Sequence, residues 1–194
     1  MDAHEVNGMR AMLALFVADV FASVPRKDQF LKRNQAFAAN VDLARLAMPE
    51  RLPLVLVCAD PRVEPAGFLG IGTGEAGVLR NTGGWMDGRV IEDIVYLAVR
   101  LGVRTDVAIV HHTQCGTGLL ADPAFRRSFA DRTRGDDAER AVTDPAATVR
   151  RDVEKLLADP LMTREVLASV SGYVLRLGTG LVETAAEPVA PASR

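Results

Sequence analysis

Two short, continuously apolar runs constrain the fold of this chain more than any other feature of its sequence. They are Leu52–Val57 and Val107–Val110, and between them lies an amphipathic helical pattern from Arg89 to Leu101. Strands that are apolar on both faces are typical of a parallel sheet covered by helices. Strand, helix and strand at this spacing predict a βαβ unit, and therefore an α/β fold with a mainly parallel β-sheet flanked by helices.

The other elements follow from weaker patterns. Val78–Leu79 and Tyr173–Leu175 are further strand candidates, and helices are expected over Glu5–Val24, Lys27–Leu46 and Thr148–Leu157. The first of these helices is apolar around most of its circumference. We therefore expect the N-terminal helices to pack on the core or on a partner subunit.

These elements predict a single α/β domain over residues 1–183, in which residues 1–46 form an N-terminal helical arm. The segment 184–194 is rich in Ala and Pro and is expected to be a disordered tail. The segment 122–147 is dense in Asp and Arg, which predicts an exposed loop with helical turns and a solvated charged face.

Composition excludes several classes of partner. The chain has 194 residues, with 23 Lys and Arg against 25 Asp and Glu, so its formal net charge is -2. This balance does not attract the protein to nucleic acid or to an anionic membrane. No run reaches the roughly 18 apolar residues of a membrane span. Asp2 and Glu5 stand where a signal peptide carries basic residues, so the expected location is the cytoplasm.

The first of the two cysteines, Cys58, directly follows the first apolar run and opens the pattern Cys58, Asp60, Arg62. Residues spaced by two point to one side of an extended segment, and Pro61 disfavours a helical conformation at Asp60. The prediction is one face that carries a thiol, a carboxylate and a guanidinium. Arg62 is placed to bind the carboxylate through two N–H groups and to favour its ionised form.

The second cysteine lies in the pattern His112-Thr-Gln-Cys115, which follows the other apolar run. If the two strands are neighbours, Cys58, His112 and Cys115 converge at the carboxyl edge of the sheet, where ligand sites form in open α/β sheets. Two thiolates and an imidazole with a fourth position open are typical of a catalytic zinc site. The alternative is that the cysteines act as small apolar residues and that the histidine is a hydrogen-bonded core residue.

Three other features have simpler interpretations. His111 alternates with His112 and should face the opposite side of the strand, in a packed or hydrogen-bonded role. Trp85 is expected to pack. The run Gly72–Gly77 matches the dinucleotide pattern G-x-G-x-x-G, but it precedes a strand rather than opening a helix, so no nucleotide cofactor is expected.

These motifs resemble those of the β-class carbonic anhydrases. The family's motif Cys-x-Asp-x-Arg is matched by Cys58, Asp60 and Arg62, and its motif His-x-x-Cys-Gly by His112, Cys115 and Gly116. A family segment ending in Arg-Asn-Ala-Gly-Gly is similar to Arg80–Gly84. The resemblance is specific over about residues 54–118, and Pro61 departs from the serine that is most common at that place.

The resemblance implies a function and a set of roles. Cys58, His112 and Cys115 would bind Zn2+, and the fourth ligand would be water or Asp60, which in this family exchanges between the metal and the arginine. The expected activity is the reversible hydration of carbon dioxide to bicarbonate and a proton by a zinc-bound hydroxide, with Gly116 at the substrate-binding position. The expected assembly is a homodimer or a larger homo-oligomer with the site near a subunit boundary.

Two alternatives remain open at this point. The same chemistry would let a family relative hydrolyse carbon disulfide or carbonyl sulfide. A non-catalytic zinc-binding relative is the other alternative, although a purely structural site needs neither Asp60 nor Arg62.

Overall fold

The computed structural model describes residues 27–40, 43, 49–128 and 138–192. The chain divides into two compact units, Met1–Leu46 and Ala47–Arg194. The division falls where the N-terminal arm is expected to end. The helix expected over Glu5–Val24 lies outside the described residues, so its packing stays a prediction.

The described part of the first unit is helix α2, Lys27–Ala38. The sequence pattern predicted a helix as far as Leu46, but the helix ends at Ala38 and a turn follows it; residues 41, 42 and 44–46 lie outside the described residues. The side-chain amide of Asn40 donates to the carbonyl of Ala36 at 2.8 Å, and its backbone N–H donates to Phe37 at 3.0 Å. Asn40 therefore uses the last helical carbonyls and ends the helix.

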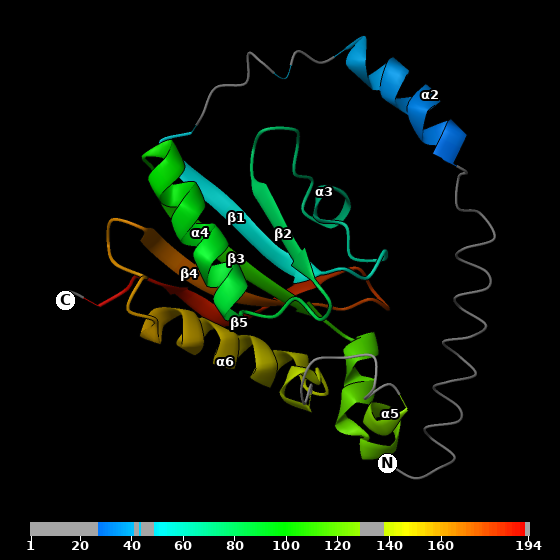
Figure 1. The fold of residues 1–194 in the computed structure, drawn as a ribbon, viewed down its shortest axis with the longest axis vertical. Coiled ribbons are helices and arrows are strands. Elements are labelled where there is room, and N and C mark those ends of the chain that lie inside the picture. Colours follow the sequence, from blue (N-terminus) through cyan, green and yellow to red (C-terminus); the bar gives the residue numbers. More distant parts are fainter. Residues whose placement is uncertain (1–26, 41–42, 44–48, 129–137, 193–194) are drawn as a thin grey trace. The chain divides into compact units, whose positions relative to one another are not determined.

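The second unit contains a five-stranded sheet in the order β2-β1-β3-β4-β5 (Figure 1). Its strands are β1 (Arg51–Cys58), β2 (Gly77–Asn81), β3 (Arg104–His112), β4 (Leu167–Leu175) and β5 (Val182–Val189). The pairs β1 with β2, β1 with β3 and β3 with β4 are parallel, whereas β5 is antiparallel to β4. The predicted mainly parallel α/β fold is confirmed.

Helices α4 (Gly88–Leu101) and α6 (Pro145–Ala158) cover one face of this sheet. The buried side of α4 includes Ile91, Ile94 and Ala98, as its apolar periodicity predicts. The other face packs against the short helix α3 (Pro65–Phe68) and the loop that follows it. Because both faces are covered, β1 and β3 are apolar on both sides.

The predicted disordered tail is wrong for residues 184–189, which belong to β5. The chain reverses at Gly180, which has a φ of +73° and donates its N–H to Arg176 at 2.8 Å. Without this strand, β4 would leave one row of backbone hydrogen-bonding groups unpaired, and β5 satisfies them despite its Ala-rich composition. Pro188 is tolerated because β5 is an edge strand.

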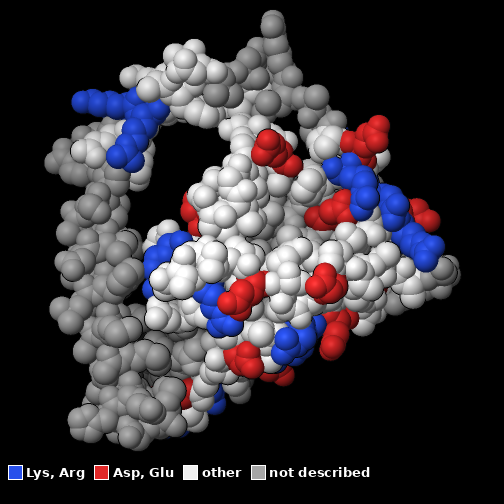
Figure 2. All heavy atoms as spheres, turned by 180° about the vertical axis from the view of Figure 1, so that it is seen from behind, with Lys and Arg blue, Asp and Glu red and all other residues white. Residues whose placement is uncertain are grey.

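The surface carries charges of both signs. On the face shown in Figure 2, Lys and Arg side chains are interspersed with Asp and Glu side chains. This mixture agrees with the small net charge of the sequence. Within the described ranges, no helix combines the length and the apolarity that a membrane span requires.

Candidate metal centre

Three candidate metal ligands meet at the carboxyl edge of the sheet. Strands β1 and β3 are parallel neighbours in which Val57 lies opposite Val110, so Cys58 and His112 emerge at the same edge. Cys115 follows β3 after a tight turn. One ligand atom from each of Cys58, His112 and Cys115 lies within 4.8 Å of the others, and all three residues are buried. The predicted adjacency of the two strands is confirmed.

The donor set fits a metal ion. His112 Nδ1 lies 2.9 Å from the carbonyl oxygen of Thr113, which only accepts, so Nδ1 carries the proton. His112 Nε2 is then a buried lone pair without a hydrogen-bond partner. The sulfur atoms of Cys58 and Cys115 are 4.0 Å apart, which is too long for a disulfide but suits two thiolates around one ion.

The two thiols differ in acidity because they interact. A hydrogen bond from the Cys115 thiol is the largest influence on Cys58 and, against the effect of burial, lowers its pKa to about 4. The N–H groups of Asp60 and Gly83 also donate to Cys58 Sγ, at 3.4 and 3.3 Å. The same contact with Cys58, together with burial, raises the pKa of Cys115. These opposite shifts make Cys58 the more acidic of the two thiols.

Asp60 and Arg62 are brought together by a turn rather than by an extended segment. The extended conformation predicted for this stretch is wrong, because Val63 donates its N–H to the carbonyl of Asp60 at 3.0 Å. Asp at the first position and Pro at the second favour such a turn, and the Asp60 side chain accepts the backbone N–H of Arg62 at 2.9 Å. The signal for this turn is the Asp60-Pro61 pair itself.

The side chain of Arg62 binds the carboxylate of Asp60 with two donors. Nε lies 2.9 Å from Oδ1 and Nη2 lies 2.6 Å from Oδ2. Burial raises the pKa of Asp60, but the hydrogen bonds and charge of Arg62 outweigh burial and bring that pKa below its usual value. Arg62 also donates to the carbonyl of Gln114, at 3.2 Å, which links the two motifs. Asp60 lies outside the group of three ligand atoms.

The segment Arg80–Gly84 closes around the start of the first motif. Arg80 donates to the carbonyls of Val63 at 2.7 Å and Cys58 at 3.2 Å. Gly84 has a φ of +72°, and a Cβ there would lie 2.9 Å from the backbone nitrogen of Cys58. Only glycine allows this approach, which places the N–H of Gly83 against the sulfur of Cys58.

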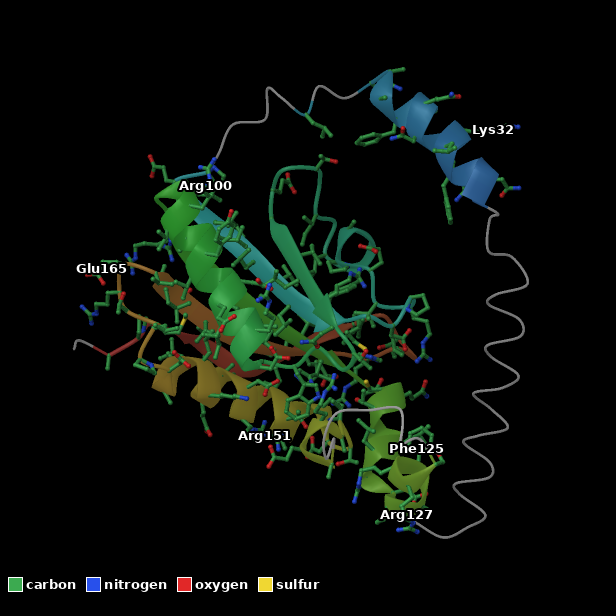
Figure 3. The ribbon with its side chains drawn as sticks, viewed as in Figure 1. Lys32, Arg100, Phe125, Arg127, Arg151 and Glu165 are labelled. Atoms are coloured by element: carbon green, nitrogen blue, oxygen red, sulfur yellow. The ribbon has the colours of Figure 1, made fainter. Side chains whose placement is uncertain are left out.

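A pocket of about 550 Å³ opens beside the sulfur atoms. Its lining includes Asp60 and Gly116, which the sequence singled out, and Phe125 and Arg140, which it did not. Phe125 belongs to α5 (Pro123–Arg127) and is labelled in Figure 3. The segment 122–147 is therefore not only a solvated face, and Val142 within it is buried against the two cysteines. The sequence signal that could have indicated this role is the presence of apolar residues, Phe125 and Val142, in an otherwise polar stretch.

His111 lies on the opposite face of β3, as predicted. Its Nε2 is 3.0 Å from Asp152 Oδ2, and both side chains are fully buried. Trp85 is buried too, and its indole N–H donates to the carbonyl of Arg140 at 2.8 Å. The guanidinium of Arg151, labelled on α6 in Figure 3, lies 4.7 Å above the Trp85 ring. These contacts attach the wall of the pocket to the helix layer.

Comparisons with known proteins agree with this geometry. A family model described as carbonic anhydrase matches residues 53–182. Beta-carbonic anhydrase 1 of Mycobacterium tuberculosis is 28% identical over 155 residues, which cover 79% of this chain and 93% of that relative.

Solved structures show the same fold. A carbonic anhydrase from Streptococcus mutans aligns with a TM-score of 0.67 and 28% identity, over 84% of this chain and 98% of that one. A carbon disulfide hydrolase aligns with a TM-score of 0.55 and 23% identity, over 81% of this chain and 88% of that one. Because the family model spans most of the second unit and includes both motifs, the chain belongs to the carbonic anhydrase family, in its β class.

Proposed function

We propose that this protein catalyses the reversible hydration of carbon dioxide to bicarbonate and a proton, with Zn2+ as its cofactor. The observation that carries the proposal is the convergence of Cys58, His112 and Cys115 beside the Asp60–Arg62 pair, at the wall of a pocket. Membership of the carbonic anhydrase family supports it.

The proposed ligands are Cys58 Sγ, Cys115 Sγ and His112 Nε2. Two thiolates and one imidazole select zinc over magnesium or calcium, and three protein ligands leave a position for water. When bound, zinc supplies the Lewis acidity that makes water a nucleophile near neutral pH. The hydrogen bond from His112 Nδ1 to Thr113 fixes the tautomer in which Nε2 is free to bind.

The proposed role of Asp60 is to orient the attacking water. Its carboxylate, held by Arg62, accepts a hydrogen bond from that water and aims the oxygen lone pair at the carbon of carbon dioxide. An O–C bond forms, the carbon–oxygen π pair moves onto a substrate oxygen, and the water proton leaves to buffer. Gly116 lines the pocket where the linear substrate would lie. Asp60 is also the proposed alternative fourth ligand when it leaves Arg62.

The ligand charges predict how the activity depends on pH. Two thiolates offset the +2 charge of zinc, whereas three neutral imidazoles leave it intact. Water at this site should therefore lose its proton at a higher pH than at a three-histidine site, and kcat/KM should rise toward alkaline pH. A flat profile from about pH 6 to about pH 9 would contradict this assignment.

The deciding experiment is stopped-flow hydration of carbon dioxide by zinc-loaded protein and by Cys58→Ser, with zinc content measured for both. The parent should bind one zinc and turn over, and the variant should lose both. Zinc-loaded parent without activity at any pH would refute the proposal and favour a non-catalytic zinc-binding relative. Faster turnover of carbon disulfide or carbonyl sulfide than of carbon dioxide would instead favour the sulfur-substrate alternative.

We also propose that the protein is a cytoplasmic homodimer or larger homo-oligomer. Tyr96 and Val99 on α4 are 65% and 72% exposed, an apolar surface that a second copy could cover. The two cysteines form no disulfide, which suits a reducing compartment. Light scattering coupled to size exclusion would test the assembly, and a monomer at micromolar concentration would contradict it.

A further inference from the structure

Thr117 lies one residue beyond the His-x-x-Cys-Gly motif, and the motif assigns it no role. It belongs to the short helix η2 (Gly116–Ala121), which begins directly after Cys115. The residue is only 5% exposed, and it lines the pocket. Its hydroxyl oxygen lies 3.1 Å from Cys115 Sγ. A buried hydroxyl therefore contacts one of the two proposed ligand sulfurs.

The direction of this hydrogen bond follows from the proposed role of the sulfur. When Cys115 is a metal ligand, its sulfur has no proton. A thiolate sulfur only accepts, so the Thr117 hydroxyl, 3.1 Å away, is the donor.

The two sulfurs obtain their hydrogen bonds from different sources. Cys58 accepts from the backbone N–H groups of Asp60 and Gly83, which no side-chain substitution removes. Cys115 accepts from the side chain of Thr117. The methyl carbon of Thr117 lies 3.3 Å from the position of a Cβ on Gly83, so its methyl group faces that backbone. This packing holds the hydroxyl toward the sulfur.

We propose that Thr117 is a positioning residue that tunes the metal centre by donating its hydroxyl proton to the sulfur of Cys115. Such a hydrogen bond withdraws electron density from a thiolate ligand and stabilises its charge, which strengthens metal retention and leaves the metal a stronger Lewis acid. The inference rests on the proposed zinc site, and it adds a residue to that site whose effect is on the metal rather than on the substrate.

The test compares Thr117→Val, which keeps the methyl group but lacks the hydroxyl, with Thr117→Ser, which keeps the hydroxyl. Two quantities are measured. Zinc affinity is determined by competition with a chelator, and the wavelength of the sulfur-to-metal charge-transfer band is recorded on the Co2+-loaded protein. Thr117→Val should bind zinc about 10-fold more weakly, and its band should move to longer wavelength because the sulfur electrons rise in energy. Thr117→Ser should remain near the parent in both measurements.

Thr105→Val is the matched control. Thr105 is fully buried at the other end of β3, and its hydroxyl donates to the carbonyl of Val166 at 2.9 Å. This variant loses a buried hydroxyl hydrogen bond far from the sulfur, and its zinc affinity and Co2+ spectrum should be unchanged. Thermal melting of each variant confirms that it is folded before binding is compared.

The outcomes separate this inference from the proposed function. A parent that binds no zinc contradicts the proposed metal site itself. A parent that binds zinc, with Thr117→Val equal to it in affinity and in spectrum, overturns only the role of Thr117. An equal loss in Thr117→Val and Thr105→Val also overturns it, because the effect would then be one of general stability.

Discussion

Arg62 binds both carboxylate oxygens of Asp60, with Nε 2.9 Å from Oδ1 and Nη2 2.6 Å from Oδ2. The backbone N–H of Arg62 adds a third donor to Oδ1 at 2.9 Å. The side chains of both residues are mostly buried, at 14% exposure for Asp60 and 22% for Arg62. The carboxylate is therefore held in one orientation beside the candidate metal ligands before a substrate arrives.

Arg62→Lys tests this orientation while keeping the positive charge. A lysine is a point charge and cannot bind two oxygens as a planar fork, so we expect kcat/KM for carbon dioxide to fall about 10- to 100-fold. Zinc content should remain that of the parent. Arg127→Lys, at an exposed position of α5, is the control and should keep full activity. Parental kcat/KM in Arg62→Lys would show that the fork contributes nothing.

Zinc binding should release one proton per ion at neutral pH. Cys58, with its pKa lowered to about 4, is already a thiolate, whereas Cys115, with its pKa raised, must lose a proton to bind. Zinc affinity should therefore increase about 10-fold per pH unit between about pH 7 and about pH 8. Indicator-dye measurements in weakly buffered solution would count the protons, and a release of two would contradict the assignment.

Asp152→Ala should destabilise the fold strongly. Asp152 Oδ2 is 3.0 Å from His111 Nε2 and accepts the N–H of Met86 at 3.2 Å, with no solvent contact. Removing one member of a buried pair leaves the other groups unsatisfied, at a cost of about 3 kcal/mol. The loss of unfolding free energy is measured by urea unfolding of the metal-free parent and variant. Glu154→Ala, exposed on the same helix, should change stability by less than about 0.5 kcal/mol; an equal change would refute the role of the pair.

Gly84→Ala should disturb the metal centre through the backbone. The residue has a φ of +72°, and a Cβ would lie 2.9 Å from the nitrogen of Cys58. We expect a loss of about 1 to 3 kcal/mol in unfolding free energy and weaker zinc binding. Gly88→Ala is the matched control, because a Cβ at Gly88 meets nothing within 4 Å. Similar behaviour of the two variants in unfolding and chelator titrations would contradict this explanation.

The sequence alone determined the type of most elements and the location of the candidate metal ligands. The apolar runs before Cys58 and His112 predicted two buried strands, and the helix between them predicted their parallel arrangement, because periodicity reflects which faces are buried. The motifs then placed Cys58, His112 and Cys115 at one edge of the sheet. These inferences depend on local patterns, which a single sequence contains.

The tertiary structure decided the contacts between distant segments. Thr117 touches the sulfur of Cys115, and Phe125 and Arg140 line the pocket, because the chain after β3 folds back over the sheet edge. The final strand exists because β4 offers it an edge to pair with, and its own composition carries no strong strand signal. Such pairings depend on register and on the shape of neighbouring elements, and neither is a property of a short run of residues.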